Sequence, residues 1–318
     1  MEIKRIFLDG KYPNQVKALR SQVIEGDFPF QITEDFDNCD IYLAFDLIDK
    51  VCLISGTSNN IIKILIRQEP KIVLPQIYDK QITAKFDLVI DIGRSDSIHG
   101  KAINYWPQDL RKYINRMDAK EEKIVMINSN LLSLADGEMY SLRRQAISNL
   151  KNLDLYGYQW NNSFFKKLKT FCLELKKYKL EIHNIKLAGL KLYFKHMDNY
   201  LGQVEDKRAT MSIYKYCLVI ENSIDYVSEK LFDSLLSECI PIYVGPDLSR
   251  FKIPSYLYFQ AKPNLDDIKN KIEAAKKTDF NEWRNCLNSW IATPNTYENW
   301  SQDLFLSKIF TVIQEIYQ

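Results

Sequence analysis

The sequence predicts an α/β protein of two doubly wound domains, each built on a parallel sheet. Short apolar runs of strand length alternate with longer segments in which apolar residues recur at helical spacing. This alternation is typical of parallel strands joined by right-handed helical crossovers. A length of 318 residues and an apolar content of 46% are sufficient for two domains with separate cores.

The first domain is predicted from four apolar runs in the first third of the chain. These runs span residues 4–10, 39–45, 61–66 and 86–92. Between the first two, residues 14–24 carry apolar side chains at helical spacing. Charged residues dominate 111–123, which we interpret as the connection between the domains. We therefore expect domains of residues 1–115 and 116–318, and the last helix could pack back on the first domain.

A second series of strands and helices begins at residue 123. Strands are expected at 123–130, 153–158, 214–220, 240–245 and 256–260, and helices at 140–153, 225–238 and 264–277. In doubly wound sheets, ligands bind beyond the carboxyl ends of the strands. The polar segments at these ends are the predicted site, and they span residues 68–70, 128–130, 221–226 and 245–247.

Composition and motif spacing exclude several classes of protein. A net charge of +2 provides no strong overall field for nucleic acid, and the ten glycines form neither a GxG pair nor a GxxxxGK motif. Six cysteines lack CxxC spacing and are expected to be buried free thiols, and three histidines form no zinc-binding pattern. Without a signal-peptide pattern or an apolar stretch of spanning length, the sequence predicts a cytoplasmic protein.

The segment after the strand at 214–220 has the features of an anion site. A helix predicted to begin near Asp225 would point its free N–H groups and its positive end at the strand terminus. Such an arrangement binds an anion without a glycine-rich loop. Alternatively, Asn222 and Asp225 only cap the turn, and Glu229 and Lys230 in the first helical turn are solvated.

Four motifs in this region resemble the signature of the α-1,3-fucosyltransferases, glycosyltransferase family ten. They are Ile220-Glu221-Asn222-Ser223, Tyr226-Val227-Ser228-Glu229-Lys230, Ile240-Pro241-Ile242-Tyr243-Val244-Gly245-Pro246 and Pro254-Ser255-Tyr256-Leu257. Their order matches the family over about forty residues. Ser228 stands where the family usually has threonine, and Ile220 where it usually has phenylalanine.

Shorter motifs extend the resemblance upstream. Tyr140-Ser141-Leu142-Arg143-Arg144 resembles the family segment that carries a donor-contacting arginine. Arg143 is in the matching position, and Arg144 is expected to face solvent. Gln68-Glu69-Pro70 is similar to the turn that supplies the catalytic carboxylate, so Glu69 is the expected general base. Alternatively, Glu69 only caps the turn before Pro70. Residues 1–50 show no resemblance.

The resemblance implies the GT-B architecture, with two Rossmann-like lobes facing a cleft, and an inverting transfer of L-fucose from GDP-β-L-fucose to a glycan hydroxyl. Cations that face the departing diphosphate stabilise it most in the transition state. The resemblance assigns this role to Arg143 and Lys230, contacts with donor hydroxyls to Glu229, and the nucleotide pocket to Asn222 and Tyr226.

One DxD-like triplet occurs, Asp35-Phe36-Asp37. In metal-dependent transferases such a triplet binds a divalent ion that bridges the donor phosphates. Here it lies in the first domain, far along the chain from the residues assigned to the donor. We interpret it as a solvated loop and expect no obligatory metal or other cofactor.

Residues 166–195 hold nine lysines and two glutamates, a local net charge of +7. Aromatic and aliphatic residues lie between the lysines. Two interpretations stay open: a solvated helix face, or peripheral docking of Lys166–Lys195 on anionic phospholipid, which would suit a lipid-linked acceptor. No RNA-binding motif accompanies the segment, so no nucleic-acid partner is expected.

The sequence therefore favours a bacterial-type fucosyltransferase that acts on a surface glycan such as the lipopolysaccharide O-antigen, in the cytoplasm or at the inner membrane. Its partners would be the nucleotide-sugar donor and the glycan acceptor. Two alternatives stay open. One is the same fold with another GDP-linked deoxysugar donor, and the other is a catalytically silent relative that binds a glycan or nucleotide.

Overall fold

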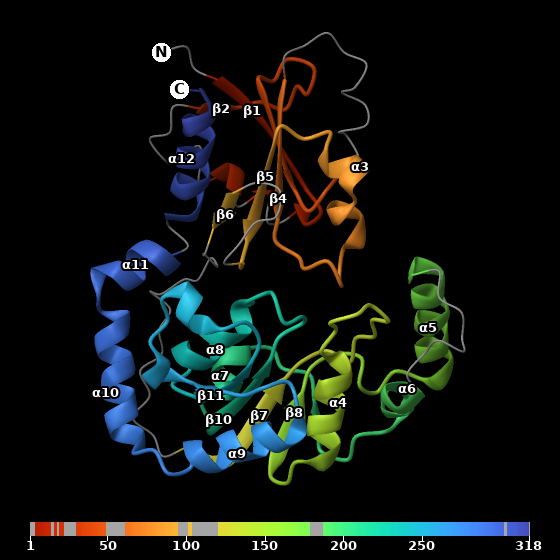
Figure 1. The fold of residues 1–318 in the computed structure, drawn as a ribbon, viewed down its shortest axis with the longest axis vertical. Helices are drawn as coiled ribbons and strands as arrows, with labels where there is room; N and C mark the ends of the chain where they lie inside the picture. The colour runs from red at the N-terminus through yellow and green to blue at the C-terminus, as the bar shows by residue number, and fades with distance from the viewer. Residues whose placement is uncertain are drawn as a thin grey trace. The chain divides into compact units, whose positions relative to one another are not determined.

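The structure, a computed structural model, describes residues 4–13, 16–17, 19–21, 30–48, 61–94, 101–103, 120–178, 187–301 and 304–317. The chain divides into two compact units (Figure 1). Unit 1 comprises Met1–Pro107 and Asn299–Gln318, and unit 2 comprises Gln108–Glu298. The expected boundary at residue 115 falls outside the described residues.

Unit 1 is built on a six-stranded parallel sheet. Its strands are β1 (Lys4–Gly10), β2 (Phe30–Ile32), β3 (Ile41–Phe45), β4 (Ile62–Arg67), β5 (Leu88–Ile92) and β6 (Lys101–Ile103), in the order β2-β1-β3-β4-β5-β6. A 3₁₀ turn (Pro75–Tyr78) and α3 (Lys80–Thr83) follow β4, and α12 (Phe305–Tyr317) ends the chain. The expected strands at 4–10, 39–45, 61–66 and 86–92 are confirmed as β1, β3, β4 and β5.

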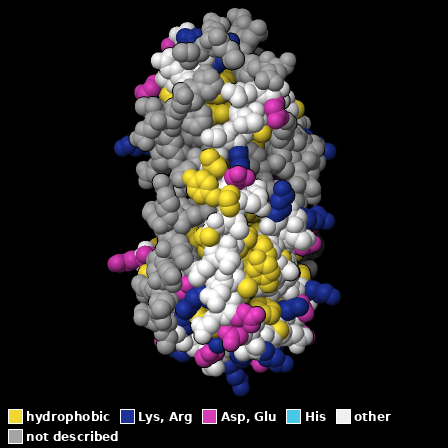
Figure 2. Space-filling model, turned by 90° about the vertical axis from the view of Figure 1, so that its left-hand side faces the viewer, with side chains coloured by type: hydrophobic (Ala, Val, Ile, Leu, Met, Phe, Trp, Pro, Cys, Tyr) yellow, Lys and Arg dark blue, Asp and Glu magenta, His cyan; other side chains and the backbone are white. Residues whose placement is uncertain are grey.

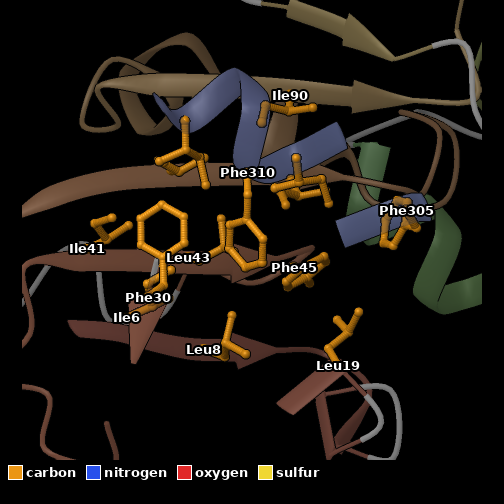
Figure 3. Packing of buried hydrophobic residues seen from close by; sticks show 14 of the residues in the cluster. Ile6, Leu8, Leu19, Phe30, Ile41, Leu43, Phe45, Ile90, Phe305 and Phe310 are labelled. Atoms are coloured by element: carbon orange, nitrogen blue, oxygen red, sulfur yellow. The ribbon is translucent and has the colours of Figure 1, made fainter. Parts of the chain in front are cut away.

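Both faces of the unit 1 sheet are covered, and successive residues of β3 alternate between two cores. Leu43 and Phe45 pack on one face with Phe305 and Phe310 of α12 (Figure 3). Tyr42 belongs to the core on the other face. This alternation follows from the two-residue repeat of a strand. The C-terminal helix is therefore an integral part of the unit 1 core.

Unit 2 contains a second six-stranded parallel sheet. Its strands are β7 (Glu121–Ile127), β8 (Leu153–Tyr156), β9 (Tyr200–Gly202), β10 (Tyr214–Ile220), β11 (Ile240–Val244) and β12 (Phe259–Gln260), in the order β12-β11-β10-β7-β8-β9. The central strands β10 and β11 are buried over nearly their whole length. The prediction of two domains with parallel sheets is therefore confirmed.

Helices connect the strands of unit 2 and continue toward the C-terminus. They are α4 (Tyr140–Asn149), α5 (Phe164–Tyr178), α6 (Leu187–Phe194), α7 (Lys207–Met211), α8 (Glu229–Leu236), α9 (Leu265–Ala275), α10 (Phe280–Ile291) and α11 (Pro294–Trp300). None of the helices in the described part of the chain is long and apolar enough to cross a membrane.

Several expected elements have different bounds. The strand expected at 256–260 is reduced to Phe259–Gln260, because Ser255–Leu257 form a 3₁₀ turn directly after Pro254. The three-residue strands β2, β6 and β9 were not predicted, since such short segments carry too little periodicity. Free thiols were expected to be buried, but Cys172 is exposed on α5.

Replacement of Phe310 by alanine is expected to destabilise the protein by about 3–5 kcal/mol, because the side chain is buried and its loss leaves a cavity. Its ring lies 4.8 Å from that of Phe30 between centroids. Urea unfolding should show the loss as a lower midpoint. Gln314→Ala, at an exposed position of the same helix, should change stability by less than about 0.5 kcal/mol. Equal effects of the two substitutions would show that α12 is not part of the core.

Candidate functional site

Polar residues gather at the carboxyl ends of strands in both units, as expected for doubly wound sheets. In unit 2 they follow β10 and include the first turn of α8 and the first turns of α4. In unit 1 they follow β3 and β4.

The Arg143 guanidinium joins α4 to the end of β10. Its Nε and Nη2 donate to the carbonyl oxygen of Ile220, at 3.0 and 2.6 Å, and Nη2 also donates to Asn222 Oδ1 at 2.8 Å. Among the described residues, Nη1 has no hydrogen-bond partner. That nitrogen is therefore the part of the guanidinium that can bind an anion at this edge.

The expectation that Arg144 faces solvent is wrong. Arg143 and Arg144 are both buried, at 2% and 1% exposure, because each guanidinium binds a backbone carbonyl. Arg144 Nη1 donates to Leu131 O at 2.7 Å, and its guanidinium lies 5.5 Å from the centre of the Tyr193 ring. Burial lowers the pKa of Arg144 to about 10, so it is still a cation at neutral pH.

Glu221 lies directly after β10 and is completely buried. Its Oε1 accepts from the backbone N–H of Ser228 at 2.9 Å and its Oε2 accepts from the Ser228 hydroxyl at 2.5 Å. The Tyr243 hydroxyl also donates to Oε1, at 3.4 Å. Burial raises the pKa of Glu221, whereas the Lys230 charge and the Ser228 bonds act in the opposite direction. The carboxylate thereby ties the end of β10 to the start of α8.

The helix after this loop begins later than the sequence suggested. Ser228, not Asp225, is the N-cap of α8, and its hydroxyl oxygen accepts from the Lys230 N–H. Asp225 instead accepts from the Ser223 hydroxyl at 2.7 Å. Tyr226 is buried, which leaves it a supporting role in a ligand site rather than extensive contact with a ligand. The helix begins later than expected because Glu221 holds Ser228 in the capping position.

Glu229 and Lys230 lie in the first turn of α8 and face other charged groups. Lys230 Nζ donates to the Ser228 hydroxyl oxygen at 3.0 Å and lies 3.8 Å from Glu229 Oε1. Lys207 Nζ, from α7, lies 3.4 Å from the same Glu229 oxygen. Burial raises the pKa of Glu229, but Lys230 and Lys207 outweigh it, so the pKa lies below its ordinary value. Glu229 is therefore ionised at neutral pH.

Gly245 is required by the close approach of β11 to Glu221. A Cβ at this position would lie 2.3 Å from the Tyr243 hydroxyl and 2.8 Å from Glu221 Cγ. These contacts exclude any larger residue without a shift of the buried carboxylate. Gly245 therefore leaves the space that the Glu221 side chain and the Tyr243 hydroxyl occupy.

In unit 1, Glu69 follows β4 in a turn whose backbone is fixed on both sides. Asp46 Oδ1 accepts from the N–H groups of Gln68 and Glu69 at 2.8 and 3.2 Å. The Tyr78 hydroxyl donates to the Glu69 carbonyl at 2.8 Å, and the Tyr12 hydroxyl donates to Glu69 Oε1 at 2.9 Å. The carboxylate itself is only half-buried, so Oε2 can meet a ligand. The prediction that Glu69 follows a strand end is correct.

Two guanidinium groups lie close to the ring of Tyr78. The Arg67 and Arg94 Cζ atoms lie 4.3 and 4.9 Å from the centre of its ring. Arg67 also makes a buried two-pronged ion pair with Asp91, at 2.6 and 2.7 Å. These contacts fix the ring and, through its hydroxyl, the Glu69 backbone.

Asp46 is the acidic residue of this region that sequence reasoning missed. It is 2% exposed, and its backbone adopts a left-handed conformation with φ of 53°. Burial raises the pKa of Asp46 to about 7, although the two backbone donors act to lower it. Its only sequence signal is its place directly after an apolar strand.

In unit 2, Lys207 was also missed by sequence reasoning, because no motif connects it with Glu229.

Asp35 and Asp37 lie in an exposed loop of unit 1. Asp35 Oδ1 accepts from the Asp37 N–H at 3.1 Å, and Oδ2 accepts from Asn38 Nδ2 at 2.6 Å. The Asp35 carboxylate therefore stabilises its own turn. Within the described ranges, no group of three or more His, Cys, Asp or Glu side chains is arranged to hold a metal ion.

Asp46→Asn is expected to change the pH dependence of stability. Because the folded state raises the pKa of Asp46 from 3.8 to about 7, it holds this proton more tightly than the unfolded state. The contribution to stability is thus complete below pH 4 and is lost as the pH rises through 7. Relative to the variant, the free energy of unfolding of the unmodified protein should fall by up to about 4 kcal/mol between pH 4 and 8.

Urea unfolding over this pH range measures the difference. Asp37→Asn is the matched control, because the same change at an exposed aspartate should leave the two pH curves parallel. Parallel curves for Asp46→Asn as well would contradict the assigned environment.

Comparison with solved structures defines the architecture. The Anabaena protein HepE, in complex with UDP and glucose, has a TM-score of 0.60 at 10% identity, with 98% of this chain and 100% of that chain covered. A glycosyltransferase from Rickettsia africae has a TM-score of 0.55 at 11% identity, with both chains fully covered. An α1,3-fucosyltransferase with GDP has a TM-score of 0.52 at 13% identity, with 98% and 90% covered. The chain has the GT-B fold.

Sequence comparison is more specific for unit 2. No curated protein matches the chain at a significant level. Residues 144–300, just under half of the chain, match the family model for the C-terminal part of glycosyltransferase family 10 (fucosyltransferase). The matched range contains Ser228, Glu229, Lys230 and Gly245, whose contacts are described above. The chain is thus a glycosyltransferase whose residues 144–300 are similar to the C-terminal part of family 10, the fucosyltransferases.

Proposed function

We propose that this glycosyltransferase transfers L-fucose from GDP-β-L-fucose to a hydroxyl group of a glycan, with inversion to an α-1,3 linkage. The observation that carries this proposal is the cationic edge of unit 2. There Arg143, Lys230 and the capped start of α8 meet at the carboxyl end of β10, within or next to the family 10 domain. The reaction would belong to the synthesis of a bacterial surface polysaccharide, such as a lipid-linked O-antigen.

The proposed donor roles follow from the charge that develops in the reaction. As the bond from the sugar to the diphosphate breaks, negative charge grows on the leaving phosphate and positive charge grows on the anomeric carbon. Arg143 Nη1, Lys230 Nζ and the N–H groups of α8 would stabilise the phosphate. Because these cations are already at the site, we propose that no divalent ion is required and that activity persists in EDTA.

Three further residues would complete the donor site. Glu229 is ionised and half-buried, so its carboxylate can accept hydrogen bonds from sugar hydroxyls. Asn222 is held by Arg143 and would face the nucleotide, whereas Tyr226 would support the wall behind it. Lys207, bound to Glu229, would keep that carboxylate ionised.

Glu69 would act as the general base for the acceptor. Its carboxylate would take the hydroxyl proton as the acceptor oxygen attacks the anomeric carbon. The fixed backbone on both sides of Glu69 supports this role, because a base must be held within hydrogen-bond reach of the proton that it removes.

In this proposal the cations would contact the diphosphate rather than the sugar, so another GDP-linked deoxysugar would fit the same edge. A silent relative would bind the donor and not turn it over. HepE is complexed with UDP and glucose, so a uridine nucleotide belongs in any test of donor choice.

A panel of nucleotide sugars tests the donor. GDP-fucose and GDP are expected to raise the melting temperature, and UDP-glucose is not, because ligand binding to the folded state stabilises it. Stabilisation by UDP-glucose alone would overturn the proposed donor. Stabilisation by GDP-fucose without release of GDP in the presence of glycan acceptors would favour the silent relative.

Lys230→Ala is expected to weaken GDP binding roughly 10- to 100-fold, since it removes a charged hydrogen-bond donor to the diphosphate. Isothermal titration calorimetry measures the affinity. Lys277→Ala, which removes the same charge from an exposed position of unit 2, serves as control and should bind normally. Normal binding by both variants would remove Lys230 from the phosphate site.

Glu69→Gln is expected to lower kcat roughly 10²- to 10⁴-fold and to leave GDP-fucose binding unchanged, because glutamine cannot accept the proton. Glu34→Gln changes an exposed glutamate of the same unit and should leave the rate intact. Activity that survives in Glu69→Gln would identify another residue as the base.

A further inference from the structure

Helix α5 presents a wide apolar face that is largely exposed, although the Phe164 ring lies 5.2 Å from the Phe194 ring of α6 between centroids. Phe165 and Phe164 are 80% and 60% exposed, and Leu173 is 56% exposed. Leu168 and Cys172 are exposed as well. Large apolar side chains gathered at one surface are unusual for a soluble domain and mark an interaction site.

The opposite side of α5 attaches the helix to the rest of unit 2. Lys167 is buried, with Nζ 5.8 Å from the centre of the Tyr193 ring on α6. Near the other end of the helix, the Ser133 hydroxyl donates to Tyr178 Oη at 3.4 Å. Figure 1 shows α5 at the margin of unit 2, next to α6. The helix is therefore held from one side, and its outer half is open.

The outer half carries positive charge. Lys169 and Lys176 are exposed and follow Phe165 at four and eleven residues, so they lie on the same face of the helix as the phenylalanine. Lys166 is exposed beside them. Neither Lys166, Lys169 nor Lys176 pairs with an acidic group among the described residues.

The only acidic residue of α5 does not offset this charge. The Glu174 side chain is 13% exposed and is bound by Lys177 at 3.4 Å. By contrast, the face shown in Figure 2 carries basic and acidic side chains intermixed. The outer half of α5 thus combines exposed aromatic and aliphatic groups with charge of one sign.

We propose that this outer face, formed by Phe164, Phe165, Leu168, Cys172 and Leu173 with Lys166, Lys169 and Lys176, docks on the surface of an anionic phospholipid bilayer. An interfacial helix inserts its apolar groups to the depth of the headgroups, while lysines extend along them to the lipid phosphates. The proposed surface is smaller than the segment Lys166–Lys195 that the sequence indicated, because Lys167 is buried and Lys177 is paired with Glu174.

The chemistry of the face favours lipid over a second copy of the chain. Two copies joined through α5 would bring three lysines of each copy opposite one another without an acidic partner on that face. A bilayer with anionic headgroups accepts the lysines and the aromatic rings together. The proposal does not depend on the identity of the donor sugar.

Vesicle co-sedimentation of the full chain tests the proposal. Binding is expected to vesicles of phosphatidylcholine with 30% phosphatidylglycerol, and much less to phosphatidylcholine alone, and it should weaken at high salt. Replacement of Lys166, Lys169 and Lys176 by glutamine should weaken binding roughly 100-fold, because the attractions of the three lysines to the anionic lipids add together. Phe164→Ala with Phe165→Ala should weaken it at least roughly 10-fold at constant charge.

A matched triple variant controls for the loss of charge. Lys262, Lys269 and Lys277 are exposed in unit 2 away from α5, and their replacement by glutamine should leave vesicle binding within roughly twofold. Equal losses in the two triple variants would show that only net charge matters and would overturn the docking face.

Three other results would also overturn it. The first is a protein that does not bind anionic vesicles. The second is vesicle binding that depends neither on salt nor on anionic lipid. The third is a protein that binds single-stranded RNA and not vesicles. A stable dimer in analytical ultracentrifugation that Phe165→Ala dissociates would identify the face as a contact between copies instead.

GDP affinity, measured in parallel, separates this proposal from the donor assignment, because the α5 variants should bind GDP normally.

An environment-sensitive label on Cys172 provides a direct readout. Cys172 is exposed, whereas Cys39, Cys217 and Cys239 are buried. The emission should shift to shorter wavelength when anionic vesicles are added, and the Cys172→Ser protein treated with the same reagent should show no shift. A label on Cys172 that stays in water while the protein sediments with vesicles would place the contact elsewhere.

Discussion

A buried carboxylate at the end of β10 organises the candidate site of unit 2. Glu221 has no exposed surface, and an unpaired charge in that position would cost several kcal/mol. The cost is offset because the backbone and hydroxyl of Ser228 and the hydroxyl of Tyr243 all point at it. Those bonds decide where α8 begins, and therefore which groups its first turn presents. Gly245 leaves the space that the arrangement needs.

Two sets of hydrogen bonds hold the charged groups at this edge of the unit 2 sheet. Arg143 fixes Asn222 and the last carbonyl of β10, while Ser228 connects Glu221 to Lys230. A cation that is positioned before the ligand arrives needs little reorganisation when charge develops on the leaving group. The edge is thus suited to an anionic leaving group, which is what a nucleotide-sugar transferase has to stabilise.

Unit 1 positions the Glu69 carboxylate in a different way. Glu69 is held by its backbone, through Asp46 on the N–H side and Tyr78 on the carbonyl side, and among the described residues Tyr12 binds one of its carboxylate oxygens. Asp46 combines a strained left-handed backbone with burial, a combination that persists only where the surroundings impose it. Rigid support beneath a half-buried carboxylate keeps it accessible while limiting its movement.

The sequence alone determined the two parallel sheets, since apolar runs such as 214–220 and 240–244 can be buried only as central strands. It also determined the family signature around Glu229 and Lys230, because these residues lie close together in the chain. Tertiary structure decided what depends on distant partners. Asp225 is as good a capping residue as Ser228, but only the fold brings Ser228 to the Glu221 carboxylate.

Contacts with distant parts of the chain also explain where the burial of charged side chains differs from the prediction. Arg143 and Arg144 are neighbours in the sequence, and both are buried because separate carbonyls, of Ile220 and Leu131, lie within reach of them. Lys167 is one lysine among nine, and its burial against Tyr193 could not be read from the helical repeat. Local sequence fixes secondary structure and short motifs, whereas the partner of a charged side chain is set by packing between segments far apart in the chain.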